Sequence, residues 1–296
     1  MVSVVKKVKK GATYYYLRYH TAGLEKTRYL GRRIPDDIEA RKREFELDML
    51  RLQWRPVLED IRTGYARVPE SQRIDDYEEF SYRFTHDTQK IEGSSLTKKE
   101  TYELLRFNLT PAQKPESDML EAKLHHQIFT DMARKPPPRL DMRRIMSWHK
   151  AMFEKTKPEI AGVLRQHAVF ITGSDSRFPH HRFVPAFVRD FFKWLNSRDS
   201  RRAMSPVELA GAAHFRFVNI HPFGDGNGRT SRLLMNYILI KNGYPPLNIR
   251  FADRYRYYRV LEKGNLQYDE MHFLKWFVKY YMKRNGQYSG SARQYA

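Results

Sequence analysis

The sequence of 296 residues contains no cysteine, which excludes a disulfide framework and thiolate chemistry. It also lacks long hydrophobic runs. Apolar stretches such as 233–240 are far shorter than the roughly 20 residues that a membrane-spanning helix needs, and the first residues show no apolar core of a signal peptide. We therefore expect a cytoplasmic protein with no membrane partner.

Acidic residues are scarce relative to basic ones. The 34 Asp and Glu residues face 54 Lys and Arg residues, which gives a net charge of +20. A field of this sign attracts nucleic acid, nucleotides or acidic protein surfaces. A basic, well-solvated surface explains the charge equally well, because composition does not place the charges. The hydrophobic content of 41% indicates a folded protein that can bury a large core.

Residues 1–34 form a basic, β-rich segment. β-branched and aromatic residues between glycines predict short strands. Residues 1–33 contain nine Lys or Arg and the single acid Glu25, which is +8 of the net charge. Aromatic residues interleaved with cations suit nucleic-acid contact. A small sheet that packs its tyrosines on the main body needs no ligand, and the composition favours this simpler alternative.

The rest of the chain is predicted to be mainly α-helical. A long helix or connector is expected over 35–74, followed by a helical domain over 75–285 and a flexible polar tail over 286–296. Capping signals predict helix starts at Thr97, Asp141 and Ser205. The helical rhythm breaks between Gly162 and Pro185, where 168–172 and 180–183 predict an internal β-hairpin.

Residues 221–232 combine features that a nucleotide site requires. They read His-Pro-Phe-Gly-Asp-Gly-Asn-Gly-Arg-Thr-Ser-Arg. Pro222 must interrupt the preceding helix, and the glycines then allow a sharp turn with bare N–H groups. The next helix, expected at 230–241, follows directly. A glycine-rich turn before a helix N-terminus is an anion-binding site.

Four side chains in this segment fit the same chemistry. His221 is suited to act as general base for a hydroxyl nucleophile, and Asp225 is the hard oxygen ligand that Mg²⁺ prefers. Arg229 and Arg232 lie near one helix face and can bind terminal phosphates. Each residue alone has a common structural explanation, so only the joint pattern indicates a nucleotide polyphosphate beside a reactive hydroxyl.

The segment resembles the signature of Fic-domain proteins at every defining position: His221-x-Phe223-x-Asp225-Gly226-Asn227-Gly228-Arg229-x-x-Arg232. The resemblance covers about 75–285 and implies a Fic-type helical bundle. It implies an ATP-dependent nucleotidyltransferase that moves AMP onto a Tyr, Thr or Ser hydroxyl of a target protein. In these terms, His221 takes the hydroxyl proton, Asp225 binds Mg²⁺, and the turn over 226–228 forms the anion hole. Arg229 and Arg232 bind the phosphates, Phe223 anchors the loop, and the hairpin at 168–183 is a flap that aligns the target.

A second motif lies upstream. Thr88 and Glu92 share one helix face, and Gly93 ends that helix. A solvated glutamate is the simpler explanation from physics alone. However, Thr88-x-x-x-Glu92-Gly93 resembles the inhibitory motif of Fic proteins, at the end of a helix expected over about 75–93. In that family the glutamate pairs with the second arginine, here Arg232, and blocks the γ-phosphate. The resemblance therefore implies autoinhibition.

Other functions remain open. The same glutamate can position a water that removes AMP, which would make the chain a de-AMPylase. A nucleic-acid-associated regulator, binding through residues 1–33 and sensing nucleotide in the helical domain, is a second alternative. A homo-oligomer is also compatible with the sequence. The His125-His126 and His180-His181 pairs lack further ligands at zinc-like spacing and are interpreted as structural or exposed.

Overall fold

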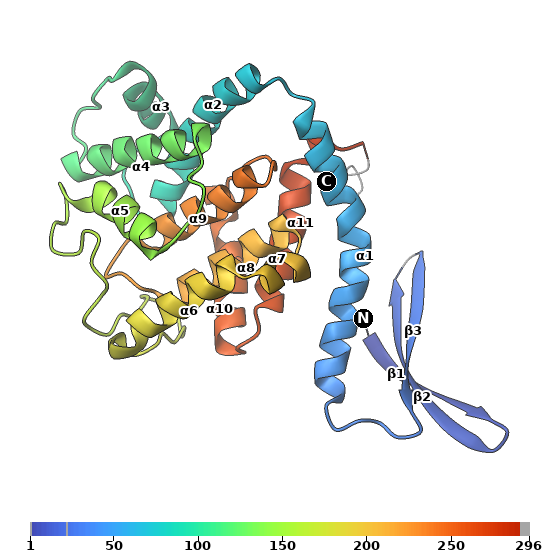
Figure 1. The fold of residues 1–296 in the computed structure, drawn as a ribbon. Helices are drawn as coiled ribbons and strands as arrows, with labels where there is room; N and C mark the ends of the chain where they lie inside the picture. Colours follow the sequence, from blue (N-terminus) through green and yellow to red (C-terminus); the bar gives the residue numbers. More distant parts are fainter. Residues whose placement is uncertain (1, 22, 291–296) are drawn as a thin grey trace. The chain divides into compact units, whose positions relative to one another are not determined.

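The computed structural model describes residues 2–21 and 23–290, and its contacts divide the chain into two compact units, Met1–Glu59 and Asp60–Ala296 (Figure 1). A three-stranded antiparallel sheet belongs to the first unit, with strands β1 (Val2–Lys9), β2 (Ala12–Thr21) and β3 (Leu24–Gly31) in that order. Lys10 and Gly11 have φ values of 46° and 77°, which the tight β1–β2 turn requires. The strands predicted from the sequence are thus formed.

One face of this sheet packs on a helix. Leu17 and Tyr19 of β2 are buried with Phe45 and Met49 of α1 (Ile38–Ala66), and five partly buried apolar side chains surround them: Val2, Val4, Leu24, Leu30 and Ile38. An ion pair from Arg28 to Asp48, with a distance of 2.6 Å, lies beside this core. The first unit therefore has a small hydrophobic core of its own.

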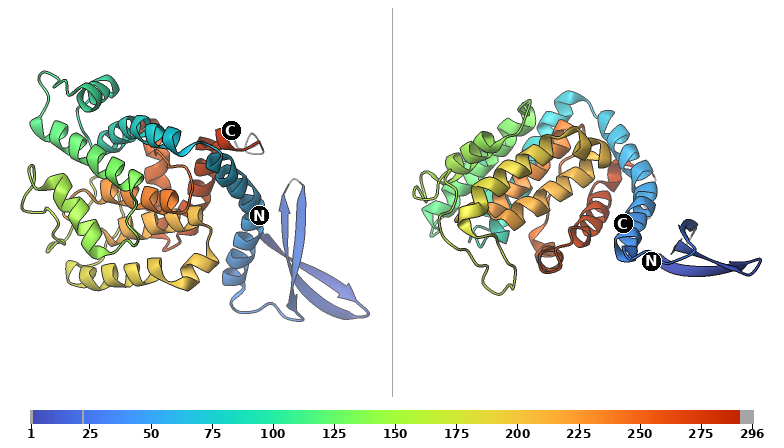
Figure 2. Two further views of the ribbon diagram at one scale, coloured as in Figure 1. Left: turned by 45° about the horizontal axis from the view of Figure 1, so that its top comes forward. Right: turned by 60° about the horizontal axis from the view of Figure 1, so that its bottom comes forward.

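The second unit is a bundle of helices (Figures 1 and 2). Its members after α1 are α2 (Glu70–Ile91), α3 (Lys98–Phe107), α4 (Glu116–Arg134), α5 (Met142–Phe153), α6 (Val184–Asn196), α7 (Arg198–Ala203), α8 (Pro206–Ile220), α9 (Asn227–Lys241), α10 (Arg254–Leu266) and α11 (Met271–Arg284). Three short 3₁₀ turns complete it: η1 (His181–Phe183), η2 (Phe251–Asp253) and η3 (Gly286–Tyr288).

Helix α9 runs through the middle of the bundle and contacts α8, α2, α4 and α5. Every residue from Arg229 to Ile240 is buried. A helix surrounded on all sides buries polar side chains with its apolar ones, so those polar groups need partners inside the protein. This burial explains why the arginines of α9 make such specific contacts.

Sequence capping signals are confirmed at three helix starts. Thr97 and Glu100 form a reciprocal capping box on α3, and Ser205 and Glu208 form another on α8. The Asp141 side chain accepts a hydrogen bond from the backbone N–H of Arg144 at the start of α5. Each cap satisfies backbone N–H groups that a helix N-terminus leaves without acceptors.

The expectation of an internal β-hairpin is wrong. No strand forms at 168–172 or 180–183, although both segments are described; a turn with Gly173 at φ 76° joins irregular backbone instead. The guanidinium of Arg165 donates to the carbonyl oxygens of His167 (2.8 Å) and Pro179 (2.6 Å), which brings the two ends of the segment together. Hydrogen bonds from the Arg165 side chain thus take the place of backbone hydrogen bonds between two strands. We call residues 167–179 the flap loop.

The C-terminal tail also differs from the expectation over its described part. Residues 286–288 form η3, and the ring of Tyr288 packs edge-on against Tyr65 near the end of α1, with centroids 5.1 Å apart. Ser289 is buried and its hydroxyl donates to Asp60. Residues 286–290 are therefore ordered against the second unit. The rest of the predicted flexible tail, 291–296, lies outside the described residues.

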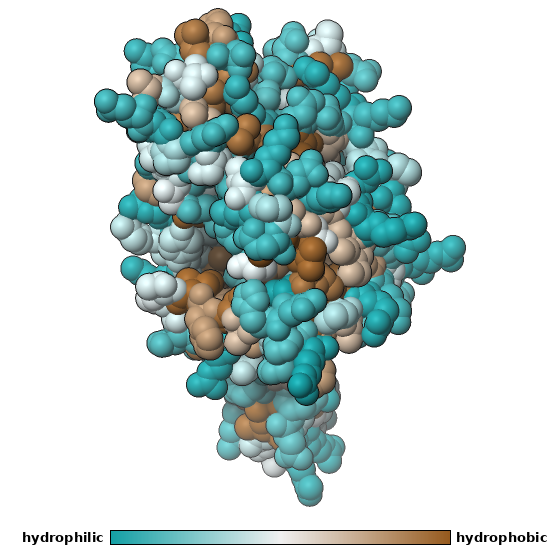
Figure 3. Space-filling view, turned by 90° about the vertical axis from the view of Figure 1, so that its left-hand side faces the viewer, coloured by the Kyte–Doolittle hydropathy of each residue, from teal (hydrophilic) through white to brown (hydrophobic). Residues whose placement is uncertain are grey.

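None of the helices in the described ranges is both long enough and apolar enough to cross a membrane. The face drawn in Figure 3 is mostly hydrophilic, with apolar side chains in small separate groups.

Candidate active site

The loop between α8 and α9 begins at His221. This residue ends α8 in the left-handed conformation, with φ 49°. Its backbone carbonyl accepts a hydrogen bond of 2.6 Å from the Arg165 guanidinium, and the carbonyl of Pro222 accepts one of 2.9 Å from the Arg165 backbone N–H. A non-glycine residue in this conformation is strained. Arg165 stabilises it and joins the loop to the base of the flap loop.

Phe223 anchors the loop in the core, as the resemblance implied. Its side chain is buried and stacks on the ring of His149, with centroids 3.8 Å apart. The amide side chain of Asn227 closes the loop behind it, because it accepts from the Phe223 N–H and donates to the Phe223 carbonyl, both at 2.9 Å. The side chain of Asn227 is therefore structural, and only its backbone is left for the predicted anion-binding turn.

Two glycines of the turn are required by close packing. Gly226 has a φ of 75°, and a Cβ there would overlap the ring of Phe153. A Cβ at Gly228 would overlap the carboxylate of Glu92. Since α9 begins at Asn227, its first N–H groups have no intrahelical acceptors and lie at the positive end of the helix dipole. The backbone geometry here is of the kind that the predicted anion site requires.

His221 is held as a neutral imidazole. Its Nδ1 lies 3.2 Å from the carbonyl of Val218, which can only accept, so Nδ1 carries the proton and Nε2 keeps its lone pair. Burial, outweighing that hydrogen bond, lowers the pKa of His221 from 6.5 to about 4. The ring of Phe178 from the flap loop packs beside it, with centroids 4.3 Å apart. A neutral ring with a free lone pair is the form that can accept a proton.

Asp225 is an ionised carboxylate. Burial alone would raise its pKa, but the charge of Arg229 and the hydrogen bond from Lys157 outweigh burial and lower the pKa to about 2. Lys157 donates to Oδ2 over 2.7 Å, and the Gly226 N–H donates to Oδ1 over 2.5 Å. The side chain remains 42% exposed. It can therefore still reach a ligand outside the protein.

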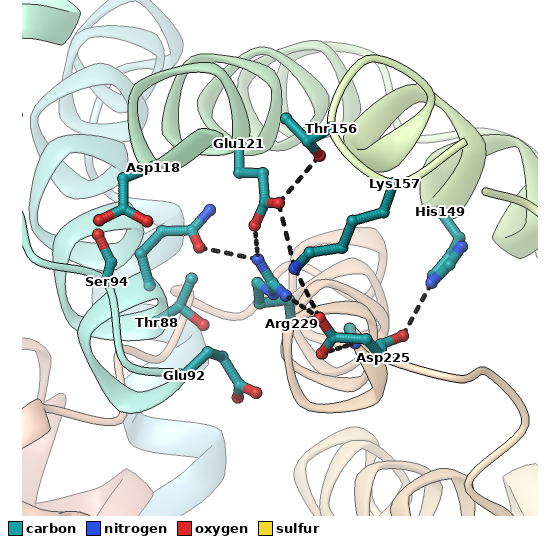
Figure 4. A network of polar contacts seen from close by, with 12 residues as sticks. Thr88, Glu92, Ser94, Asp118, Glu121, His149, Thr156, Lys157, Asp225 and Arg229 are labelled. Atoms are coloured by element: carbon teal, nitrogen blue, oxygen red, sulfur yellow. Dashed lines mark hydrogen bonds and ion pairs between the residues drawn. The ribbon is translucent and has the colours of Figure 1, made fainter. Parts of the chain in front are cut away.

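Arg229 lies in a buried polar network (Figure 4). Its guanidinium donates to Glu121, to Gln89 (3.1 Å) and to Asp225 (3.3 Å). Glu121 also contacts Lys157 (3.3 Å) and accepts from Thr156 (2.9 Å). Because the side chain of Arg229 is only 3% exposed, it is committed to these partners. The sequence predicted Arg229 as a phosphate ligand and did not identify Glu121, Lys157 or Gln89.

Arg232 binds the two residues of the upstream motif. Its guanidinium donates to the Thr88 hydroxyl and to the Glu92 carboxylate, the latter at 2.6 Å. It also donates to the Thr88 carbonyl (3.2 Å) and to the hydroxyl of Tyr257 (3.4 Å). Arg232 is 1% exposed, while the side chain of Glu92 is 24% exposed. The two segments that the sequence suggested would meet lie in contact.

A pocket of about 630 Å³ brings these residues together. The α8–α9 loop contributes His221 and 224–228, and α2 contributes Ile91 and Glu92 at its end. Its lining also includes flap-loop residues 170–174 and a face of α10. That face comprises Tyr257, Tyr258, Leu261, Glu262 and Asn265. Arg232 also lines the pocket, whereas Arg229 is not among its lining residues.

Helix α10 (Arg254–Leu266) was not predicted from the sequence. Its pocket residues recur at i, i+1, i+4, i+5 and i+8, which is a helical spacing that the sequence itself contains. Glu262 accepts hydrogen bonds from the Ser174 hydroxyl (2.6 Å) and the Asp175 N–H (3.0 Å). Asn265 accepts from the Arg177 N–H (2.7 Å) and donates to its carbonyl (2.9 Å). Helix α10 therefore both walls the pocket and fixes the tip of the flap loop.

Comparison with known proteins agrees with this geometry. Residues 139–239 match the model of the Fic/DOC family. "Protein adenylyltransferase Fic" of Drosophila ananassae is 32% identical over 192 residues, which is 62% of this chain and 37% of that protein. "Protein adenylyltransferase fic-1" of Caenorhabditis briggsae is 28% identical over 243 residues, 76% of this chain and 44% of that protein. The chain thus spans less than half the length of these relatives.

Solved structures show the same architecture. A fragment of Fic-1 from C. elegans has a TM-score of 0.72 at 25% identity, covering 88% of this chain and 77% of that one. A Fic domain containing signaling protein from Bacteroides thetaiotaomicron has a TM-score of 0.69 at 23% identity, covering 80% and 97%. The second match concerns the fold alone. With the signature loop, the helical fold and the relatives in agreement, the chain contains a Fic/DOC-family domain over residues 139–239.

Proposed function

We propose that this chain is a protein adenylyltransferase, which moves AMP from ATP to a hydroxyl side chain of a target protein. One observation carries the proposal: the neutral His221, with its lone pair on Nε2, lines the same pocket as the free N–H groups at the start of α9. A proton acceptor and an anion site in one pocket are what transfer of a phosphoryl-linked group to a hydroxyl needs. The names of the relatives support the same activity.

The reaction follows from these positions. The hydroxyl oxygen of the target attacks the α-phosphorus of ATP, and its proton passes to Nε2 of His221. The bond between the α-phosphorus and the oxygen that bridges to the β-phosphate breaks, and pyrophosphate leaves with that electron pair. In the turn over 226–228, the Gly226 N–H is held by Asp225, and the N–H groups of Asn227 and Gly228 stabilise charge on the phosphate oxygens. Arg232 supplies a guanidinium for the terminal phosphates once Glu92 is displaced.

The residues present fit a magnesium ion held jointly with the nucleotide. Asp225 is ionised and half exposed toward the pocket. In the described part of the chain no group of three His, Cys, Asp or Glu residues could hold a metal ion alone. Mg²⁺ commonly takes one or two carboxylates and completes its shell with phosphates and water. When bound, the ion neutralises charge on the phosphates of ATP; Asp225 would hold it.

The remaining walls of the pocket suit adenine and the target. Tyr258 and Leu261 of α10 offer aromatic and apolar surface to a purine ring. Two apolar side chains of the flap loop also line the pocket, and of these Phe170 is 87% exposed and Ile171 is 42% exposed. A polypeptide segment laid along these two side chains would bring its Tyr, Thr or Ser hydroxyl to His221. The flap loop thus replaces the expected hairpin as the target-aligning element.

The enzyme as folded is inhibited by Glu92. The carboxylate binds Arg232 at 2.6 Å and lies directly over Gly228, in the space that phosphates would enter. A bound glutamate adds like charge against the polyphosphate and occupies the guanidinium that would receive it. Displacing Glu92 should therefore be required for productive ATP binding.

The test uses ATP labelled at the α-phosphate. Glu92→Gly should increase incorporation of label into protein by tenfold or more, and adding His221→Ala should abolish it. Glu154→Gly is a matched control, because Glu154 also follows the last residue of a helix, α5, and is exposed. If Glu92→Gly and Glu154→Gly behave alike, the inhibitory contact has no function. Label that persists after His221→Ala would overturn the transferase mechanism.

A second activity at the same site is removal of AMP. The carboxylate of Glu92 is 24% exposed and lies in the pocket beside the phosphate site, where it can orient a water molecule toward a phosphodiester. Incubation with an AMP-modified target separates the two directions. If the chain is a de-AMPylase, the wild-type protein should release AMP from the modified target, and Glu92→Gly should lose this activity. Release that is unaffected by Glu92→Gly would exclude this role for the glutamate.

A further inference from the structure

The outer face of the β1–β2–β3 sheet carries tyrosines and cations. Leu17 and Tyr19 point toward α1, so their neighbours Tyr16 and Arg18 point to the opposite face. Tyr16 lies opposite Val5 and Tyr29 in the strand register. The alternation of side chains along the strands thus separates an apolar inner face from a different outer one.

Ring contacts define this outer face. Tyr29 packs against Tyr16 and Tyr14, with centroids 5.2 and 6.3 Å apart. The ammonium of Lys7 lies 5.1 Å from the ring of Tyr16, and the guanidinium of Arg32 lies 5.8 Å from the ring of Tyr14. Tyr29 remains 54% exposed although it is large and aromatic. The face is therefore an aromatic cluster bordered by cations, which we call the tyrosine platform (Tyr14, Tyr16, Tyr29, Lys7, Arg18 and Arg32).

Charge is divided within the first unit. Residues 2–33 hold nine Lys or Arg residues and one acid, Glu25. Of these nine, all within the described residues, only Arg28 forms an ion pair, with Asp48 and Glu44 on α1. The other acids of the unit all lie in 36–59. Because α1 packs on the inner face, its carboxylates leave the charge of the platform largely uncompensated.

The combination of exposed aromatic rings and unpaired cations indicates one chemical class of binding partner. An apolar protein surface would not need the cations, and a purely acidic surface would not need the exposed rings. A nucleic-acid strand has phosphates for cations and flat bases and sugars for aromatic rings. We propose that the tyrosine platform binds nucleic acid, with Lys7, Arg18 and Arg32 on phosphates and Tyr29 stacked on a base or sugar. The proposal is independent of the transferase activity.

Fluorescence anisotropy of the full-length protein tests the charges. Labelled single-stranded DNA, single-stranded RNA and duplex DNA of about 20 nucleotides or base pairs each serve as probes, at several salt concentrations. The triple variant Lys7→Ala, Arg18→Ala, Arg32→Ala should weaken binding at least tenfold. In this variant the slope of log K against the logarithm of the salt concentration should be less steep by about 2 to 3, since each lost phosphate contact lowers the slope by about 0.7 to 0.9.

A charge-matched control separates the platform from the overall charge of the protein. Lys135, Arg139 and Lys155 are exposed cations of the second unit, and the structure describes no ion pair for them. Their triple alanine variant changes the net charge equally and should bind as wild type does. Equal loss in both triple variants, or no binding of any of the three nucleic acids by wild type, would overturn the proposal.

Tyr29 tests the aromatic contact. Tyr29→Phe keeps the ring and should keep the affinity, whereas Tyr29→Ala should lower it about fivefold or more, as expected for loss of a stacked base. A loss confined to the single-stranded probes would assign the ring to unpaired bases; a loss on the duplex as well would assign it to the sugar–phosphate edge. Either result supports nucleic acid. Two results would contradict the proposal. One is unchanged affinity in Tyr29→Ala, and the other is competition by polyglutamate that is as effective as competition by unlabelled nucleic acid. Either would show that the surface binds polyanions through charge alone.

Discussion

At the scale of single residues, Glu121 governs the charge balance of the site. It is a buried carboxylate shared by Arg229, Lys157 and Thr156, and its two cations in turn contact Asp225. A neutral side chain at this position could not replace Glu121, because Arg229 and Lys157 would then share Asp225 as their one carboxylate partner. Glu121 thus positions Arg229 and Lys157, which in turn hold the carboxylate of Asp225.

Replacing Glu121 with Ala should lower the free energy of unfolding by about 3 kcal/mol, since it leaves a buried guanidinium without its main partner. Glu121→Gln should lose less, because the amide oxygen can still accept from Arg229. Urea unfolding monitored by tryptophan fluorescence measures both. Glu154→Ala, an exposed control, should change stability by less than about 0.5 kcal/mol. Equal stability of all three variants would show that the network contributes no net stabilisation.

His149 makes stability depend on pH. Its Nδ1 accepts from the Gly162 N–H (3.0 Å), so Nε2 carries the proton and donates to the Asp225 carbonyl (2.9 Å). Burial lowers its pKa from 6.5 to about 4. Between these values the unfolded chain binds the proton and the folded protein does not, so stability falls as pH decreases from about 6.5 to about 4.

The variant His149→Phe should show a shallower pH dependence in that window, by up to about 1.4 kcal/mol per pH unit. The measurement is the free energy of unfolding in urea at half-unit steps of pH from 4 to 7. Whatever the variant costs in absolute stability, only the slope reports the proton. An unchanged slope would mean that His149 is protonated in the folded state as readily as in the unfolded chain.

The residues that we propose to react could be found from the sequence, because His221, Asp225 and Arg232 lie within twelve positions of one another. Glu92 was placed by its motif. Glu121, Lys157 and Arg165 could not be found in the same way. They contact the loop across 56 to 108 positions, and isolated charged residues at such separations leave no local pattern. Only packing of α4 and the segment after α5 beside α9 identifies them.

At the scale of elements, the flap loop is stabilised by side chains at both ends. Arg165 binds the carbonyls of His167 and Pro179, and α10 binds the tip through Glu262 and Asn265. The sequence of 168–172 has strand character, but a strand needs a partner for its backbone groups. No second strand lies beside 168–172 in the described residues, and α10 instead binds residues 174–177 of the same loop.

Cleavage by trypsin after Arg177 measures this attachment. Asn265→Ala removes both hydrogen bonds to the Arg177 backbone, so local opening should become easier and cleavage at this bond several times faster. Gln267→Ala, an exposed change one position beyond α10, is the control. Mass spectrometry of the peptide that ends at Arg177 gives the rate. Equal rates in the two variants would show that Asn265 does not restrain the flap loop.

At the scale of the whole molecule, the net charge of +20 is spread over both units. The nine cations of residues 1–33 account for less than a fifth of the 54 basic residues. Like charges repel in the compact state more than in the expanded chain. Repulsion among these charges therefore destabilises the folded protein, although burial of its core overcomes that repulsion.

Raising sodium chloride from about 20 to 200 mM should raise the Tm by several degrees, because the screening length falls below the spacing of most surface charges. Differential scanning calorimetry at constant pH gives the result. A Tm that falls with salt would mean that the exposed ion pairs, such as Arg106–Glu79 at 2.9 Å, outweigh the net repulsion.

The pairing of Glu92 with Arg232 has a consequence for how the site could be controlled. Both residues belong to one chain and to the second unit, so they meet at an effective concentration that the fold sets. Dilution of the protein therefore does not weaken this contact within the chain. Relief must come from a ligand that competes for the guanidinium or that displaces the last turn of α2. The proposed inhibition by Glu92 would therefore depend on such a ligand and not on the concentration of the protein.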